Sequence, residues 1–103
     1  MTVPTENVTT LAGYQSAARR TINRELTSDQ RLLDAAAGLA EEAGEVLSHV
    51  RKHLLQGRPL DRDAVLLELG DALWCLAIAA DTLGVSLQDV AQRNVEKLRA
   101  RHP

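Results

Sequence analysis

The sequence predicts an all-α fold in which four helices form one small domain, a four-helix bundle-like arrangement. Leu and Ala dominate the composition, aromatic residues make up 2% of it and Phe is absent, which favours close-packed helices over sheets. Apolar residues recur at helical spacing, and Gly, Pro and capping residues divide the chain between the helices. A chain of 103 residues with 45% hydrophobic residues can bury one small core.

The first helix is predicted from about Val8 to Leu26, after a flexible leader at residues 1–7, so that residues 8–103 form the domain. The start of the chain, Met1–Thr10, lacks the basic residues and the apolar core of a secretory signal, and we therefore expect a cytoplasmic protein. The apolar stripe of this helix consists of Leu11, Tyr14, Ala18, Ile22 and Leu26.

The second helix is predicted over Arg31–Gln56, with capping oxygens in Thr27-Ser28-Asp29 and an end at Gly57-Arg58-Pro59. Glu42 and Glu45 flank its apolar seam, and Glu41 lies farther round the helix. Most Glu runs on helices form solvated faces, and this helix alone does not decide between such a face and a site. The expected buried seam is Leu32, Ala36, Leu39, Ala43, Val46, Val50 and Leu54.

The third helix is predicted from Asp61 to near Gly84, and its segment Ala64–Leu83 is apolar on nearly every face. Within that segment, Glu68 and Asp71 lie on one face, about 60° and one turn apart. Two acids near the middle of the segment make a membrane span costly, so we expect a buried helix.

These two acids need a compensating partner, because a carboxylate in an apolar interior is disfavoured unless it is neutralised, paired or bound to a metal. No Lys or Arg occurs between Arg62 and Arg93, so metal ligation is the economical explanation. The single Cys75 cannot form an internal disulfide, and its place in this helix predicts a packing role in a reducing compartment.

The fourth helix is predicted to run to about Arg101 and to begin at Ser86, which forms a capping-box variant with Asp89. Asn94 lies within its apolar face, and Lys97 continues the same stripe. Residues 93–101 include four basic residues and one acid, which can screen phosphate oxygens or simply form a solvated basic helix end. The apolar face consists of Leu87, Val90, Ala91, Val95 and Leu98.

Packing of the second and third helices side by side would bring Glu42 and Glu45 against Glu68 and Asp71. Four carboxylates around one small site suit a hard cation such as Mg²⁺, with Mn²⁺ as a substitute, because such ions prefer oxygen ligands. His49, one turn after Glu45, either borders this site or is a surface residue, and the surface position is the favoured interpretation.

Several sequence blocks appear in a fixed order around these acids. The chain reads E-E-x-x-E from Glu41 to Glu45 and E-x-x-D from Glu68 to Asp71. Together the blocks resemble the MazG-like all-α nucleoside triphosphate pyrophosphohydrolases over essentially the whole chain after the leader. Cys75 departs from the pattern, because relatives often carry an aromatic residue there, and base stacking is not expected at this position. The matching blocks are Tyr14-Gln15 and residues 38–46, 68–74, 83–87, 94–98 and 101–103.

The resemblance implies hydrolysis of (deoxy)nucleoside triphosphates to monophosphates and pyrophosphate, in nucleotide-pool house-cleaning. It implies a metal held by the four acids, and Glu41 as the residue that positions or deprotonates the attacking water or binds a further metal. It also implies a homo-oligomer, a dimer or a tetramer. The candidate substrate-binding residues are Asn94, Lys97, Trp74 and Arg101, of which Trp74 is either a core or interface aromatic or a wall of the base pocket.

Two alternatives remain open on the sequence. The nearer one is another reaction of the same superfamily, such as dUTP, dCTP or phosphoribosyl-ATP hydrolysis. The more distant one is a non-enzymatic helical interaction module in which the acids form a recognition face or a structural metal site. A formal net charge of −2 and a pI near 5.9 give no overall basic field, so we expect neither nucleic acid nor a membrane as a partner.

Overall fold

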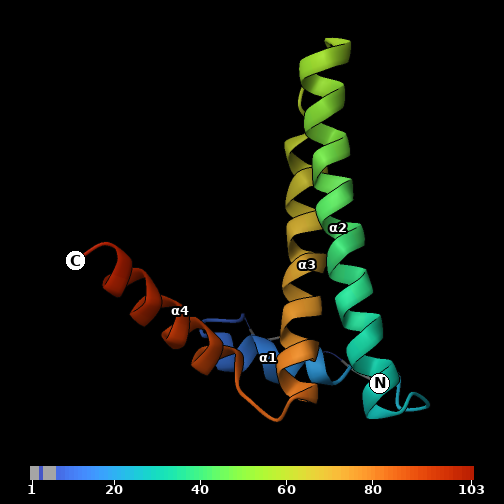
Figure 1. Ribbon diagram of the computed structural model, residues 1–103. Helices are drawn as coiled ribbons and strands as arrows, with labels where there is room; N and C mark the ends of the chain where they lie inside the picture. Colours follow the sequence, from blue (N-terminus) through green and yellow to red (C-terminus); the bar gives the residue numbers. More distant parts are fainter. Residues whose placement is uncertain (1–2, 4–6) are drawn as a thin grey trace.

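The computed structural model describes residues 3 and 7–103, and this part of the chain is helical, without strands, as predicted (Figure 1). Most of the predicted leader, residues 1–2 and 4–6, lies outside the described residues. No helix in the described part is long and apolar enough to cross a membrane. The described residues form four helices, α1 (Leu11–Arg19), α2 (Ser28–Gln56), α3 (Arg62–Thr82) and α4 (Leu87–Arg101).

The start of α2 is fixed by a reciprocal pair of hydrogen bonds between side chains and backbone. The Thr27 hydroxyl accepts from the Gln30 N–H at 3.1 Å, and Gln30 Oε1 accepts from the Thr27 N–H at 3.0 Å. This capping box satisfies two donors that the helix itself cannot pair. Gly57 ends the helix with a φ of 66°, a left-handed conformation that glycine adopts without steric cost, so both predicted boundary signals are confirmed.

The helices α3 and α4 also begin at their predicted caps. Asp61 Oδ1 accepts from the Ala64 N–H at 3.0 Å, and the Ser86 hydroxyl accepts from the Asp89 N–H at 2.9 Å. The side chain of Asp89 pairs with Arg93, one turn later, at 2.9 Å. The capping role of Ser86 is therefore confirmed, while Asp89 contributes an ion pair along α4.

The predicted extent of the first helix is wrong at both ends, because α1 spans only Leu11–Arg19. Thr10 caps its start by accepting from the Gly13 N–H at 2.9 Å. Beyond its end, the Thr21 hydroxyl donates to the Ala18 carbonyl at 2.8 Å, and Asn23 Oδ1 accepts from the Glu25 N–H at 3.0 Å. Such local bonds offer the backbone an alternative to helical hydrogen bonds. They explain why the apolar stripe in the sequence continues beyond the end of the helix.

The two long helices α2 and α3 form an antiparallel pair that extends beyond the rest of the fold (Figure 1). Their axes come close at Gly38, where an added Cβ would lie 2.9 Å from the Sγ of Cys75. Only glycine therefore fits at this crossing without a shift of the neighbouring side chain. Cys75 is buried there, as its predicted packing role requires.

The predicted buried seam of α2 is correct only in part, because Leu32, Leu39 and Val46 are half-buried while its other members are exposed. Ala36, Ala43 and Leu54 are exposed, whereas Ala35 is fully buried and Glu42 is half-buried. Where the two helices come closest, α2 carries the small residues Ala35 and Gly38, which permit the close approach. As a consequence, Glu42 lies within the contact face of α2 instead of beside it.

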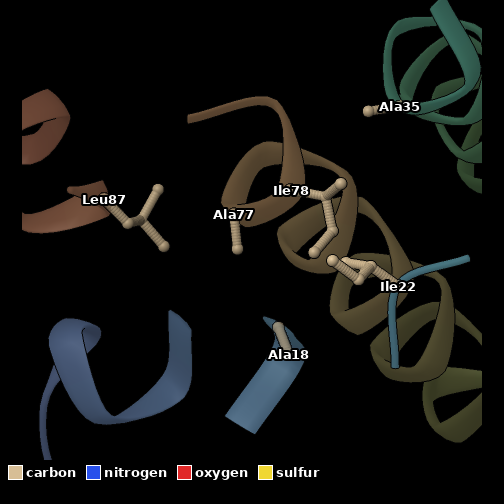
Figure 2. Close-up of a cluster of buried hydrophobic side chains, with 6 residues drawn as sticks. All are labelled: Ala18, Ile22, Ala35, Ala77, Ile78 and Leu87. Atoms are coloured by element: carbon tan, nitrogen blue, oxygen red, sulfur yellow. The ribbon is translucent and has the colours of Figure 1, made fainter. Parts of the chain in front are cut away.

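The apolar core lies at one end of the helix pair, where α3 meets α1 and α4. Figure 2 shows its buried members, which come from every helix and from the turn after α1: Ala18, Ile22, Ala35, Ala77, Ile78 and Leu87. Burial of α3 is confined to its C-terminal half, although its composition predicts burial along the whole length. Leu67, nearer its start, is 71% exposed.

Gln15 of α1 fixes the turn between α3 and α4. It is 4% exposed, its Nε2 donates to the Val85 carbonyl at 3.1 Å, and its Oε1 accepts from the Leu87 N–H at 2.8 Å. One buried amide thus satisfies a donor and an acceptor at the start of α4, and it sets the direction in which α4 leaves the core.

We expect Gln15→Leu to lower the free energy of unfolding by about 2 to 3 kcal/mol, because the Leu87 N–H and the Val85 carbonyl would stay buried without partners. Urea denaturation measures this change. The exposed Gln92, which bonds only to Glu96 on the same helix, is a matched control whose replacement by Ala should cost less than about 0.5 kcal/mol. An unchanged unfolding midpoint for Gln15→Leu would contradict this role.

Candidate functional site

Acidic side chains from both long helices meet near the middle of the α2–α3 pair. Glu42 of α2 and Glu68 and Asp71 of α3 place carboxylate oxygens within 4.8 Å of one another. Glu42 and Glu68 are half-buried, while Asp71 is exposed in the single chain, so the premise that apolar surroundings bury Asp71 is wrong. The helical spacing on each element and the register between them together produce this cluster, which we call the carboxylate group.

A second group adjoins the first and includes a histidine. Glu45 and His49 of α2 and Glu68 of α3 also have potential ligand atoms within 4.8 Å of one another. His49 is half-buried beside these acids, so in the structure it borders them, which is the interpretation that the sequence did not favour. The signal in the sequence was its position one turn after Glu45, on the same helix face. Glu68 belongs to both groups and therefore lies between them.

The charges of these acids are not balanced by basic side chains. Among residues 7–103, the ion pairs join Arg19 to Asp81 and Arg93 to Asp89, and neither includes an acid of the two groups. The pKa of Glu42 rises from its usual 4.5 to about 7, first because its side chain shares a proton with Glu68, and then through burial and nearby negative charge.

One oxygen of the carboxylate group has no partner within the protein. Glu42 Oε2 is buried and accepts no hydrogen bond when both Glu42 and Glu68 are charged. A buried carboxylate oxygen that faces further carboxylates is destabilised unless a proton or a cation joins it. All potential ligand atoms of the carboxylate group are oxygens, so Glu42, Glu68 and Asp71 fit a hard divalent cation.

The raised pKa of Glu42 predicts a pH dependence of stability in the metal-free protein. Between pH 4.5 and 7 the folded protein holds a proton that the unfolded chain has lost, so this carboxyl destabilises the fold increasingly as the pH rises. We expect Glu42→Gln to melt like wild type near pH 4.5 and at a higher temperature from about pH 7 upward, in EDTA.

Thermal melts across this pH range measure the difference between the two proteins. Glu25→Gln changes an exposed acid in the turn before α2, and its melting temperature should follow wild type at every pH. A constant offset between Glu42→Gln and wild type from pH 4.5 to 8 would show that Glu42 titrates normally.

A pocket of about 230 Å³ opens beside the carboxylate group. Trp74 forms part of its wall, and the indole Nε1 donates to the Thr21 hydroxyl at 2.7 Å, which holds the ring in place. The sequence did not indicate Asp34 or Thr21, although Asp34 lies on one stripe with Gly38 and Glu42 at intervals of four residues. The lining residues are Asp34, Gly38, Glu42, Asp71, Trp74 and Cys75.

The remaining candidates lie apart from these acids within one chain. Asn94, Lys97 and Arg101 are exposed on α4, which packs against α1 and α3 and, within the described residues, makes no contact with α2. Asn94 lines a different, mainly apolar hollow of about 310 Å³ between α1, α3 and α4. Glu41 is exposed on α2 and belongs to neither group.

Comparison with known proteins agrees with this geometry. The profile of the MazG nucleotide pyrophosphohydrolase domain matches residues 30–103. Gene 37 protein of Mycobacterium phage L5 is 41% identical over 68 residues, which are 62% of this chain and 60% of that protein. Uncharacterized protein YvdC of Bacillus subtilis (strain 168) is 38% identical over 72 residues, 61% of this chain and 68% of that protein.

The match to the phage protein spans less than two thirds of that protein's length. No solved structure matches the chain. The profile, however, covers α3 and α4 completely and nearly all of α2, and thus every acid of the two groups. The chain belongs to the MazG nucleotide pyrophosphohydrolase domain family.

Proposed function

We propose that this protein is a metal-dependent nucleoside triphosphate pyrophosphohydrolase, which releases pyrophosphate and a (deoxy)nucleoside monophosphate and serves in house-cleaning of the nucleotide pool. The family supports nucleotide chemistry in general. The observation that carries the proposal is the carboxylate group, in which three acids converge and one buried oxygen of Glu42 lacks a partner. A structural face would not require this arrangement, because solvated acids repel one another and spread apart.

In this proposal Glu42, Glu45, Glu68 and Asp71 hold Mg²⁺, for which Mn²⁺ is a substitute. A metal held by these acids would supply charge neutralisation for the triphosphate and Lewis-acid polarisation of a phosphoryl oxygen. The acids hold the positive charge of the metal beside the pocket that Trp74 lines. The phosphates would therefore bind at the acids, and the base would bind in the adjoining pocket.

The attacking group in the proposal is water. Cys75 is the nearest thiol, but burial raises its pKa, and the surrounding acids raise it further, so it stays protonated and inert. Glu41, the exposed acid that precedes Glu42, positions or deprotonates the water. Trp74 forms a wall of the base pocket, since its hydrogen bond to Thr21 holds the ring beside the acids.

We further propose that the chain assembles into a dimer or a tetramer. Apolar side chains remain exposed along the part of the α2–α3 pair that extends beyond the core, including Leu54, Leu66 and Leu67. A second copy would cover these faces, and it would allow Asn94, Lys97 and Arg101 of α4 to reach phosphates at another chain's acids. Light scattering at micromolar concentration tests this, and a mass near 11.2 kDa would contradict it.

The experiment that tests the function is a product assay on a panel of canonical and modified nucleoside triphosphates, including dUTP and dCTP, and on phosphoribosyl-ATP. We expect pyrophosphate to be released with Mg²⁺ and no turnover in EDTA, because the acids provide a metal site without a covalent nucleophile. Orthophosphate as the primary product would refute the proposed reaction. Failure of the whole panel with Mg²⁺ and with Mn²⁺ would favour a non-enzymatic module.

A further inference from the structure

We propose that His49 is a nitrogen ligand of the metal site, and that with Glu45 and Glu68 it forms a position that prefers a first-row transition ion to Mg²⁺. This inference rests on the proposed function, since it concerns the same acids. It places two cation positions on either side of Glu68. Glu42 and Asp71 form an oxygen-only position on one side, and Glu45 and His49 form a mixed oxygen and nitrogen position on the other.

The first step of the argument is geometric. His49 follows Glu45 by one helical turn, and both side chains face Glu68 on the neighbouring helix. Their potential ligand atoms lie within 4.8 Å of one another. Two ligands on opposite sides of an ion with bonds of about 2.1 Å are about 4.2 Å apart, and the limit of 4.8 Å on the separations of these ligand atoms is close to that distance.

The second step is that His49 has no other partner to explain its position. In the part of the chain that the structure describes, its ring forms no hydrogen bond and no ion pair, although two carboxylates lie nearby. His53, one turn later on α2, differs, because its Nδ1 lies 2.6 Å from the Arg58 carbonyl oxygen at the end of the helix. An uncommitted, half-buried imidazole beside two acids is available to a cation.

The third step is the chemistry of the donor sets. Mg²⁺ takes oxygen ligands and retains its waters, which suits Glu42 and Asp71. A neutral imidazole is a common metal ligand, and first-row transition ions accept it far more readily than Mg²⁺ does. Because Glu68 belongs to both groups, one carboxylate can serve both positions.

Pulsed electron paramagnetic resonance of the protein loaded with Mn²⁺ tests the nitrogen ligand directly and without an activity measurement. We expect wild type to show the ¹⁴N coupling of a coordinated imidazole, and labelling with ¹⁵N-histidine should change its pattern. His49→Gln should lose the coupling, whereas His53→Gln, the matched control on the same helix, should retain it. Helical circular dichroism checks the fold of both variants.

Competition between the two cations gives a second, independent readout. The excess of Mg²⁺ that displaces half of the bound Mn²⁺ should fall at least about tenfold in His49→Gln, since even the loss of an outer-shell partner costs this much metal affinity. The same excess should be unchanged in His53→Gln.

The outcomes separate this inference from the function on which it rests. Mn²⁺ binding by wild type without ¹⁴N coupling, or coupling that persists in His49→Gln, would overturn the assignment of His49 and leave the carboxylate site intact. If neither Mn²⁺ nor Mg²⁺ binds the wild-type protein, the proposed function fails together with the inference.

Discussion

Replacement of Glu68 by Gln should lower kcat/KM for pyrophosphate release by about a thousandfold, which corresponds to about 4 kcal/mol of transition-state stabilisation. The effect is expected to be large because Glu68 is shared by the carboxylate group and by the group that contains His49. Glu45→Gln and Asp71→Asn, which each remove a carboxylate from one group, should abolish measurable turnover as well. Initial rates with Mg²⁺ at saturating and subsaturating substrate measure these losses.

A matched control lies on the same helix as Glu68. Asp63 is an exposed acid in the first turn of α3 and belongs to neither group, so Asp63→Asn should keep its turnover. Helical circular dichroism of every variant should equal that of wild type, because the substituted acids are not part of the core. Wild-type activity in Glu68→Gln would remove that residue from the site.

The second large effect concerns metal-linked stability, and it distinguishes a metal site from a solvated acidic face. Without metal, the converging carboxylates repel one another, so Asp71→Asn should be at least as stable as wild type in EDTA. Mg²⁺ should stabilise wild type by about 2.7 kcal/mol at a hundredfold excess over Kd, because only the folded state binds it. The Asp71→Asn variant should gain far less stability from Mg²⁺.

Thermal melts of both proteins in EDTA and in saturating Mg²⁺ measure this response. Asp63→Asn should shift with Mg²⁺ as wild type does, which controls for the loss of one negative charge from α3. Equal shifts in wild type and Asp71→Asn would mean that Asp71 holds no metal, and the proposed assignment of the acids would fail.

The helix boundaries that were correctly predicted are those with a local chemical cause. Thr27, Asp61 and Ser86 each accept a hydrogen bond from the backbone three residues later, and Gly57 takes a left-handed conformation. These features depend only on neighbours along the chain, so residue types at fixed spacing reveal them. The same holds for the spacing of the acids on each helix.

Other features were predicted incorrectly, one because local hydrogen bonds compete with the helix and one because it depends on contacts between helices. The first helix ends early because Thr21 and Asn23 bond to nearby backbone groups, in competition with the helical ladder. The face of α2 that meets α3 contains Ala35, although the apolar pattern also allowed a seam through Ala36. Alanine fits a buried or an exposed face almost equally well, so periodicity alone could not select between them.

The sequence by itself determined that the fold is helical, to which family the chain belongs, and that the acids lie on two helices at one-turn spacing. Only the tertiary structure decided that Glu68 lies between two groups, that His49 joins one of them, and that α4 leads away from α2. Helix geometry fixes positions along each axis, whereas the rotation and approach of one helix against another follow from packing such as that of Gly38 on Cys75.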